Sequence, residues 1–400
     1  MYYYIVIDSF GIGADRRAAE YDDCGAHTAY HVSRAVPGPK WKFLQRLGLG
    51  NCCRLTDPAV TLEGCPPAKQ PIASFGAMEK ISPGKDTLSG HWELAGMQVN
   101  IRLSTFPQEY PSFPESLIRE RKEASGRDVI GNRAASGTVI IQELGAEQIE
   151  SGALICYTSA DSVLQIAAHE AVIPLEELYE ICEKARRISD RYQIGRVIAR
   201  PFIGTSEDGF VRTKNRRDYS IALPGPTYLE KELPGLGLRV IGVGKIGDIF
   251  NEKGIAISYH DKGNEACLNR TIALARDAAA GQNDFVFVNL VDTDMLYGHR
   301  RDAAGYCAAV SDISERLQEL YGQMKPGDRL CVTADHGCDP CYKGTDHTRE
   351  YVPFLIAEKG GPVPGKNLGR RCGFGYAMAY TAGFADETVC RAESGEGKGC

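Results

Sequence analysis

The sequence contains no apolar run of about 18 residues, the length that a membrane-spanning helix needs. It also lacks the charged first segment and the cleavage site of a secretory signal peptide. Basic residues are not in excess, since 46 Lys and Arg face 52 Asp and Glu and give a formal net charge of −6. An acidic surface attracts neither nucleic acid nor an anionic membrane. We therefore expect a cytoplasmic protein with no nucleic-acid partner and no membrane partner.

Regular cysteine spacing is absent as well. The 14 cysteines are scattered along a chain without an export signal, which predicts reduced thiols rather than a disulfide framework. Cys338 and Cys341 form a CxxC pair, but the second pair of a zinc ribbon is missing, so a zinc or redox role is not favoured. With 400 residues, 43% of them hydrophobic, the chain can bury a full core and form two or three domains.

Acidic residues follow three predicted buried strands, at residues 1–7, 285–291 and 329–334. The residues after these strands include six candidate metal ligands: Asp8, Asp294, His299, Asp335, His336 and His347. A single Asp or His after a strand is ordinarily a turn former or a helix cap. Two metal ions, however, need about six or seven donor groups, and this set comes close to that number.

The order of the predicted elements indicates how these ligands would meet. Helices expected at 264–280 and 302–324 alternate with the strands, which predicts an α/β fold with a mostly parallel sheet covered on both faces. In such sheets ligands bind at the carboxyl ends of the strands. The three strand ends should therefore converge.

Thr87 lies between glycines in the segment GKDTLSGHWE. By itself it could be a helix cap or part of a flexible loop. Beside a site for two metals, a threonine hydroxyl can lose its proton near neutral pH and act as a nucleophile.

The composition changes between residues 100 and 223, where a Pro-rich segment precedes helix-like stretches at 137–150 and 174–190. We expect an inserted α+β cap domain, 100–223, between two core segments, 1–99 and 224–400. Several basic residues lie near its end: Arg196, Arg200, Arg212, Lys214, Arg216 and Arg217. Such a run is usually a solvated face, although cations facing a metal site also suit a phosphate.

With these segments placed, the chain resembles the phosphopentomutase family of the alkaline-phosphatase superfamily. The resemblance covers about residues 5–368 and rests on eight segments in order: VIDSFGIGA, GKDTLSGHWE, YTSADSVLQIAAHE, RVIARPF, RTKNRRDYS, GVGKIGDIF, NLVDTDMLYGHRRD, and TADHGCDP with GTDHTREYVP. It implies an alkaline-phosphatase-like core domain. It also implies an enzyme that interconverts ribose 1-phosphate (or 2-deoxyribose 1-phosphate) and the corresponding 5-phosphate. It also implies two Mn²⁺ ions and a sugar bisphosphate activator, such as glucose 1,6-bisphosphate or ribose 1,5-bisphosphate.

The resemblance assigns roles to individual residues. Asp8, Asp335, His336 and the Thr87 hydroxyl would hold one metal, and Asp294, His299 and His347 the other. Thr87 would carry the phosphoryl group. The remaining matches would contact the sugar (Ser159, Asp161) or the phosphate (Arg200, Arg216, Lys245).

Two positions and one segment depart from the family pattern. Ser89 stands where Thr is usual, Cys341 stands where Thr is expected, and the segment after Arg371 does not read as the closing amphipathic helix of the family. We therefore expect an altered C-terminal tail without such a helix. Alternatives to the mutase are a two-metal phosphohydrolase or a phosphoglycerate mutase of the same superfamily, and an inactive metal-binding protein. Ligand types alone fit Mn²⁺, Zn²⁺ or Fe²⁺, and the sequence does not indicate the oligomeric state.

Overall fold

The computed structural model describes residues 1–100, 103–159, 162–277 and 283–385. It divides the chain into two compact units. The larger unit consists of Met1–Asn100 and Pro224–Cys400, and the smaller unit is Ile101–Leu223. Each unit is built around its own sheet.

An eight-stranded sheet forms the centre of the larger unit. In spatial order its strands are β10 (Ile257–Tyr259), β9 (Arg239–Val243), β11 (Asp284–Leu290), β1 (Tyr2–Ile7), β12 (Arg329–Thr333), β13 (Val352–Glu358), β2 (Ser74–Glu79) and β14 (Asn367–Cys372). β13 runs antiparallel to both of its neighbours, and the other pairs are parallel. The central strands β1 and β11 are continuous runs of mostly aromatic and β-branched residues and are almost fully buried, as expected for a sheet covered on both faces.

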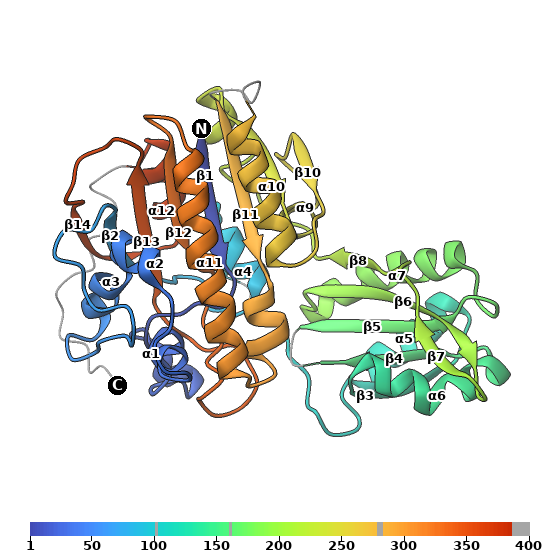
Figure 1. The fold of residues 1–400 in the computed structure, drawn as a ribbon. Coiled ribbons are helices and arrows are strands. Elements are labelled where there is room, and N and C mark those ends of the chain that lie inside the picture. Colours follow the sequence, from blue (N-terminus) through green and yellow to red (C-terminus); the bar gives the residue numbers. More distant parts are fainter. Residues whose placement is uncertain (101–102, 160–161, 278–282, 386–400) are drawn as a thin grey trace. The chain divides into compact units, whose positions relative to one another are not determined.

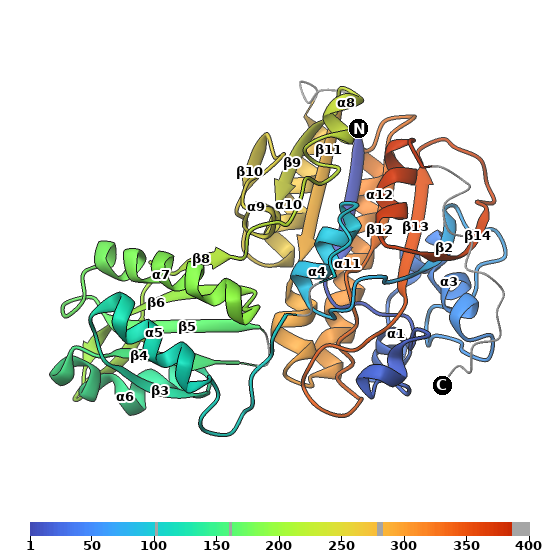
Figure 2. The ribbon, with the colours of Figure 1, turned by 180° about the vertical axis from the view of Figure 1, so that it is seen from behind.

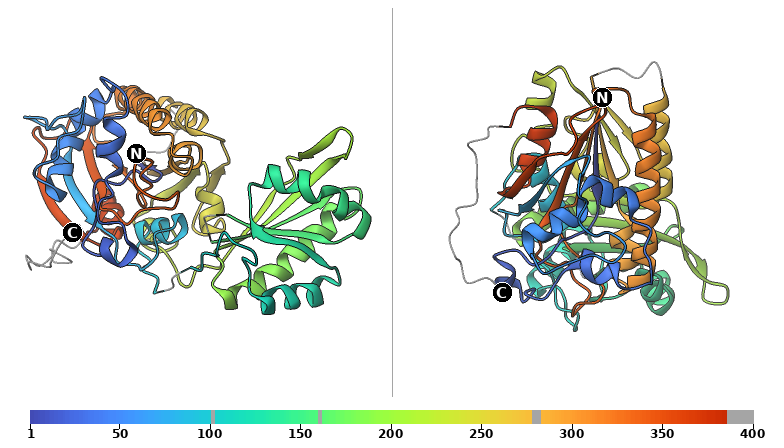
Figure 3. Two further views of the ribbon diagram at one scale, coloured as in Figure 1. Left: turned by 90° about the horizontal axis from the view of Figure 1, so that it is seen from below. Right: turned by 60° about the vertical axis from the view of Figure 1, so that its left-hand side comes forward.

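Helices cover both faces of this sheet. One face carries α10 (Asn264–Arg276) and α11 (Ala303–Gln323), together with α2 (Lys42–Leu47) and α3 (Leu49–Thr56) (Figure 1). The other face carries α4 (Thr87–Leu94), α9 (Ile246–Phe250) and α12 (Gly375–Ala382) (Figure 2). The right-hand view of Figure 3 shows α11 and α12 on opposite sides of the strands. The predicted α/β fold with a mostly parallel, doubly covered sheet is confirmed.

Shorter elements complete the larger unit. They are the helices α1 (Thr28–Ser33) and α8 (Glu232–Gly235), a 3-10 helix at Ala18–Tyr21 and a π-helix at Thr293–Gly298. The long helix α11 starts where Asp302 caps it, because the Asp302 carboxylate accepts a hydrogen bond of 2.8 Å from the Gly305 N–H. The cap and the buried face of α11 agree with the helix predicted at 302–324.

The smaller unit is a separate α+β structure. Its sheet has the order β3 (Val129–Ala134), β4 (Leu154–Thr158), β5 (Val163–His169), β6 (Arg196–Thr205) and β7 (Gly209–Arg212), and β8 (Arg217–Ser220) also pairs with β6. The helices are α5 (Glu115–Ser125), α6 (Gly137–Ser151) and α7 (Leu175–Ser189), followed by a 3-10 turn at Asp190–Tyr192. The helices predicted at 137–150 and 174–190 are therefore confirmed, whereas α5 was not predicted, because its polar sequence ESLIRERKEAS shows little apolar periodicity.

The C-terminal segment corrects one prediction. We expected no closing helix after Arg371, yet α12 forms and packs against β1, β12 and α4. Phe374, Ala377 and Met378 are fully buried. A helix that is buried on most of its sides shows no alternation of polar and apolar residues, so the amphipathic pattern that we looked for was the wrong signal.

Two further predictions concern thiols and membranes. The described cysteines are free thiols, as expected, with the exception of Cys24, which lies in a disulfide. No helix within the described residues is long and apolar enough to cross a membrane.

Candidate metal centre

The three strands that precede the candidate ligands are neighbours. β1 pairs in parallel with β11 on one side and with β12 on the other, so that Ile7 lies opposite Leu290 and Val6 opposite Thr333. Their carboxyl ends therefore meet at one edge of the sheet, as expected. The candidate acids that follow these strands, Asp8, Asp294 and Asp335, are all buried.

The first group of ligands consists of Asp8, Asp335 and His336, whose candidate ligand atoms lie within 4.8 Å of one another. His336 Nε2 is 3.5 Å from Asp8 Oδ1 and 3.2 Å from Asp335 Oδ2. The Thr87 hydroxyl oxygen lies 3.1 Å from the same His336 nitrogen. The structure thus brings the four donors of the first predicted metal together.

The second group is centred on Asp294. Its two carboxylate oxygens lie 3.3 Å from His299 Nε2 and 3.3 Å from His347 Nε2, and these two nitrogens are 3.1 Å apart. The His347 ring stacks on His336 of the first group with a centroid distance of 3.8 Å. The two predicted ligand sets are therefore adjacent.

The second nitrogen of each imidazole in this group is already bonded. His299 Nδ1 donates to the Thr345 carbonyl at 2.7 Å, and His347 Nδ1 donates to the Lys85 carbonyl at 2.9 Å. A carbonyl only accepts, so these bonds fix the tautomer and leave both Nε2 atoms unprotonated in the neutral ring. Such an imidazole is ready to ligate a metal through Nε2.

Unsatisfied carboxylate oxygens support the fit to cations. Asp8 Oδ1, Asp294 Oδ1 and Asp335 Oδ2 are buried and accept no hydrogen bond as long as the imidazole nitrogens that lie 3.1–3.5 Å from them are unprotonated. The other oxygens of Asp8 and Asp335 accept from Asn289 Nδ2 at 2.8 Å and from the Ser9 N–H at 3.1 Å. A buried anionic oxygen without a partner is costly, and a divalent cation would satisfy all three.

Burial and neighbouring charges shift the pKa values of Asp8 and Asp335 in opposite directions. Burial, followed by the charges of Asp335 and Asp294, raises the pKa of Asp8 to about 7. Burial alone would also raise the pKa of Asp335, but the charges of His336 and His91 outweigh it and hold the pKa below its usual range. Burial would lower the pKa of His336, but Asp335 raises it to about 10. A protonated His336 would offset part of the carboxylate charge, and a bound cation would do the same in its place.

Thr87 is the first residue of α4, and the preceding Asp86 is the helix cap. Asp86 Oδ1 accepts a hydrogen bond of 2.9 Å from the Ser89 N–H. The free N–H groups and the dipole at a helix N-terminus attract negative charge, so a phosphoryl group on Thr87 would be stabilised there. Of the two readings left open for this segment, the structure shows a helix start rather than a flexible loop.

Comparison with known proteins gives a consistent family. The chain matches the family model described as the Metalloenzyme superfamily over residues 2–382. It is 46% identical over 370 residues to a phosphopentomutase of Limosilactobacillus reuteri (92% of this chain and 90% of that protein), and 47% identical over 382 residues to one of Chelativorans sp. (again 92% and 90%). A phosphopentomutase of Clostridium kluyveri is 44% identical over 379 residues, covering 94% and 92%. The chain belongs to the phosphopentomutase family. It is therefore a metal-binding enzyme of the isomerase class.

Sequence reasoning missed two polar residues of this phosphopentomutase-family site. His91 Nδ1 lies 3.1 Å from Asp335 Oδ2, and Asn289 Nδ2 lies 3.3 Å from His91 Nε2 besides donating to Asp8. His91 comes one helical turn after Thr87, so a helical reading of TLSGH would have placed it on the same face. Asn289 is a polar residue within the buried run of β11, which is itself a signal of a functional contact.

Cys338 also adjoins the site. Its sulfur lies 4.0 Å from His299 Nδ1, and Asp294, His299 and Cys338 form a third group that could hold a metal. Cys341, the other member of the CxxC pair, is exposed and is in none of the candidate metal-binding groups found among the described residues.

The predicted substrate residues belong to different parts of the chain. Arg200 in β6 donates to Gln165 Oε1 at 2.9 Å, and Arg216 donates through two nitrogens to Asp218, each at 2.5 Å. Burial, followed by the charge of Arg216, lowers the pKa of Arg200 to about 10. Ser159 follows β4, Lys245 follows β9 in the larger unit, and Asp161 lies outside the described residues. Their roles remain predictions.

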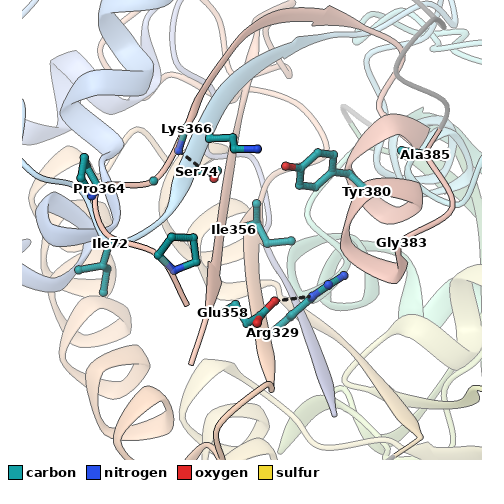
Figure 4. A pocket seen from close by; sticks show the side chains of 12 residues that line it. Ile72, Ser74, Arg329, Ile356, Glu358, Pro364, Lys366, Tyr380, Gly383 and Ala385 are labelled. Atoms are coloured by element: carbon teal, nitrogen blue, oxygen red, sulfur yellow. Dashed lines mark hydrogen bonds and ion pairs between the residues drawn. The ribbon is translucent and has the colours of Figure 1, made fainter. Parts of the chain in front are cut away.

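A cavity of about 400 Å³ in the larger unit lies away from the candidate ligands (Figure 4). Its lining includes Arg329, the first residue of β12, and Glu358, the last residue of the antiparallel β13. These residues mark the edge of the sheet opposite to the one that carries Asp335. This cavity is therefore distinct from the metal centre.

Proposed function

We propose that this enzyme interconverts ribose 1-phosphate, or 2-deoxyribose 1-phosphate, and the corresponding 5-phosphate, with Thr87 as the residue that carries the phosphoryl group. The observation that carries the proposal is the position of the Thr87 hydroxyl, 3.1 Å from His336 Nε2 at the start of α4 and beside two groups of acids and imidazoles. The relatives named phosphopentomutase support the same reaction.

The proposed site holds two Mn²⁺ ions, one by Asp8, Asp335, His336 and Thr87 and one by Asp294, His299 and His347. When bound, two cations neutralise charge that develops on a transferring phosphoryl group and favour an ionised threonine oxygen. The chain contributes the orientation, because α4 holds the Thr87 oxygen at the edge of the sheet and its N-terminus favours the negative charge of the phosphorylated residue.

In the proposed cycle a sugar bisphosphate, such as glucose 1,6-bisphosphate, first loads Thr87. The phosphorylated Thr87 then passes its phosphoryl group to the free hydroxyl of a pentose phosphate and regains the other phosphoryl group of that sugar. Water must be excluded while Thr87 is phosphorylated, since hydrolysis would turn the mutase into a phosphatase. We assign this role to a cap formed by residues 100–223, with Ser159 and Asp161 for the sugar and Arg200, Arg216 and Lys245 for the phosphate.

The test is to incubate the protein with ribose 1-phosphate, Mn²⁺ and glucose 1,6-bisphosphate and to follow ribose 5-phosphate and free phosphate together. We expect ribose 5-phosphate to accumulate, and we expect one phosphoryl group on Thr87 by intact mass and peptide mapping. Chelation of the metal and the variant Thr87→Val should each abolish the reaction, whereas Thr61→Val, at an exposed threonine of the same unit, should not. Release of phosphate without ribose 5-phosphate would identify a phosphohydrolase instead.

A further inference from the structure

A buried lysine lies beneath the helix that carries Thr87. Lys80 follows the carboxyl end of β2, and its residue is 2% exposed. Its ammonium nitrogen donates to Ser89 Oγ at 2.8 Å and lies 3.4 Å from the Asp86 carbonyl oxygen. An ammonium group is seldom buried unless opposite charge or strong acceptors surround it, so its location beside the first turn of α4 requires an explanation.

The hydrogen bonds of Ser89 connect Lys80 to the carboxylate of Asp86. Ser89 Oγ accepts a hydrogen bond from the Lys80 ammonium group and donates one to Asp86 Oδ2 at 2.7 Å, while the Ser89 N–H donates to Asp86 Oδ1 at 2.9 Å. Ser89 is fully buried. The ammonium group, the hydroxyl and the cap carboxylate therefore form one chain of charge-assisted hydrogen bonds around the residue that precedes Thr87.

The charge of Asp86 creates a conflict with the proposed reaction. A carboxylate is a good helix cap, but Asp86 is the direct neighbour of Thr87, and a phosphoryl group on Thr87 would place about two more negative charges at the same helix end. Like charges at this separation repel, more strongly in a partly buried site than in water. A cation on the buried side of α4 would offset that repulsion without occupying the space of the substrate.

We propose that Lys80 is a positioning residue that offsets the charge of Asp86 and thereby allows Thr87 to carry the phosphoryl group. The inference rests on the proposed function, since it concerns the phosphorylated form of Thr87. The charged groups that face Lys80 are Asp86, Glu93, Arg349 and Asp335. Burial lowers the pKa of Lys80 to about 8, so that the ammonium form predominates at neutral pH.

The experiment removes the charges separately and together. Lys80→Met removes the ammonium group, Lys80→Gln keeps a hydrogen-bond donor without the charge, and Asp86→Asn keeps a good cap without the carboxylate. Each variant is loaded with glucose 1,6-bisphosphate, and the fraction phosphorylated on Thr87 is measured by intact mass, together with kcat, KM and thermal unfolding. Lys366→Met, at an exposed lysine of the same unit, is the matched control.

We expect Lys80→Met and Lys80→Gln to lower the phosphorylated fraction and kcat on the order of tenfold, with little change in KM. The double variant Lys80→Met with Asp86→Asn should regain most of the loss, because the repulsion is then gone as well. A purely structural role predicts the opposite, namely that the second substitution adds to the damage.

The inference fails if Lys80→Gln is phosphorylated and turns over like the parent, or if Asp86→Asn does not relieve the defect of Lys80→Met. A parent protein that is never phosphorylated on Thr87 would instead overturn the proposed function. Unfolding of Lys80→Met would leave Lys80→Gln to decide between the outcomes, since that variant keeps a polar hydrogen-bond donor at the buried position.

Discussion

Gly90 controls how closely the helix of Thr87 approaches the metal centre. It lies inside α4, and a Cβ atom added there would be 2.4 Å from the Asp335 carbonyl oxygen and 2.9 Å from the Asp335 Cβ. These are backbone and near-backbone atoms, so no flexible side chain can yield. In the variant Gly90→Ala, either α4 or the end of β12 must move, and the Thr87 oxygen should shift relative to His336.

Two effects of opposite sign set the expected stability of Gly90→Ala. Alanine in place of glycine stabilises a helix interior by about 1 kcal/mol, whereas forcing an extra methyl group into a packed site costs about 1–3 kcal/mol. We expect the clash to prevail, with a net loss of about 0–2 kcal/mol in the free energy of unfolding. The catalytic loss should be larger, because a displacement of about 1 Å at a reacting group lowers the rate about a hundredfold.

A second helical glycine provides the control. Gly322 lies near the end of α11, and a Cβ atom added there would meet nothing within 4 Å. Gly322→Ala should therefore raise the free energy of unfolding by about 0.5–1 kcal/mol and leave kcat unchanged. Urea unfolding and steady-state kinetics on both variants are the assays. If Gly90→Ala were stabilised like Gly322→Ala and equally active, α4 would not press against Asp335 and the geometry argued for Thr87 would be wrong.

Three further variants probe buried charges. Arg121 is 1% exposed, and two of its guanidinium nitrogens lack a hydrogen-bond partner. Arg121→Leu should therefore raise the free energy of unfolding by about 1–4 kcal/mol. The control Arg119→Leu, on the exposed side of α5, should change it little. Arg349→Met leaves the Asp15 carboxylate, 2.7 Å away, buried without its cation and should cost about 3–5 kcal/mol by urea unfolding. Burial raises the pKa of Glu350 from 4.5 to about 7, so the native state binds the extra proton and stability should fall as pH rises through this window. Asp8, whose pKa is also raised to about 7, contributes a slope of the same sign. Glu350→Gln should therefore reduce the slope, and an unchanged slope would show that Glu350 does not contribute to it.

The convergence of the candidate ligands that follow strands could be predicted because a simple rule places them. Parallel strands end at a common edge, so Asp8 and Asp335 had to approach each other once β1 and β12 were neighbours. Asn289 and His91 could not be placed in the same way. Asn289 interrupts an apolar strand, and His91 lies on α4, which belongs to one face of the sheet. No local sequence pattern indicates which side chains these two residues contact. The contact of Gly90 with Asp335 cannot be predicted from hydrophobic periodicity either, since a glycine within a helix ordinarily indicates only a lower helix propensity.

The segment after the candidate ligand His347 holds the loops of the site in place. Arg349 donates to the carbonyl oxygens of Lys80, Ser82 and Gly84, in the loop that leads to Thr87. Its neighbour Glu350 accepts from the N–H of Gly13, in the loop that follows Asp8, at 3.0 Å. One short segment thus carries a candidate ligand of one group and anchors both loops that carry candidate ligands of the other. These bonds end on backbone N–H and carbonyl groups, which nearly every residue has. The sequence therefore indicates the candidate ligands but not the contacts that hold them in place.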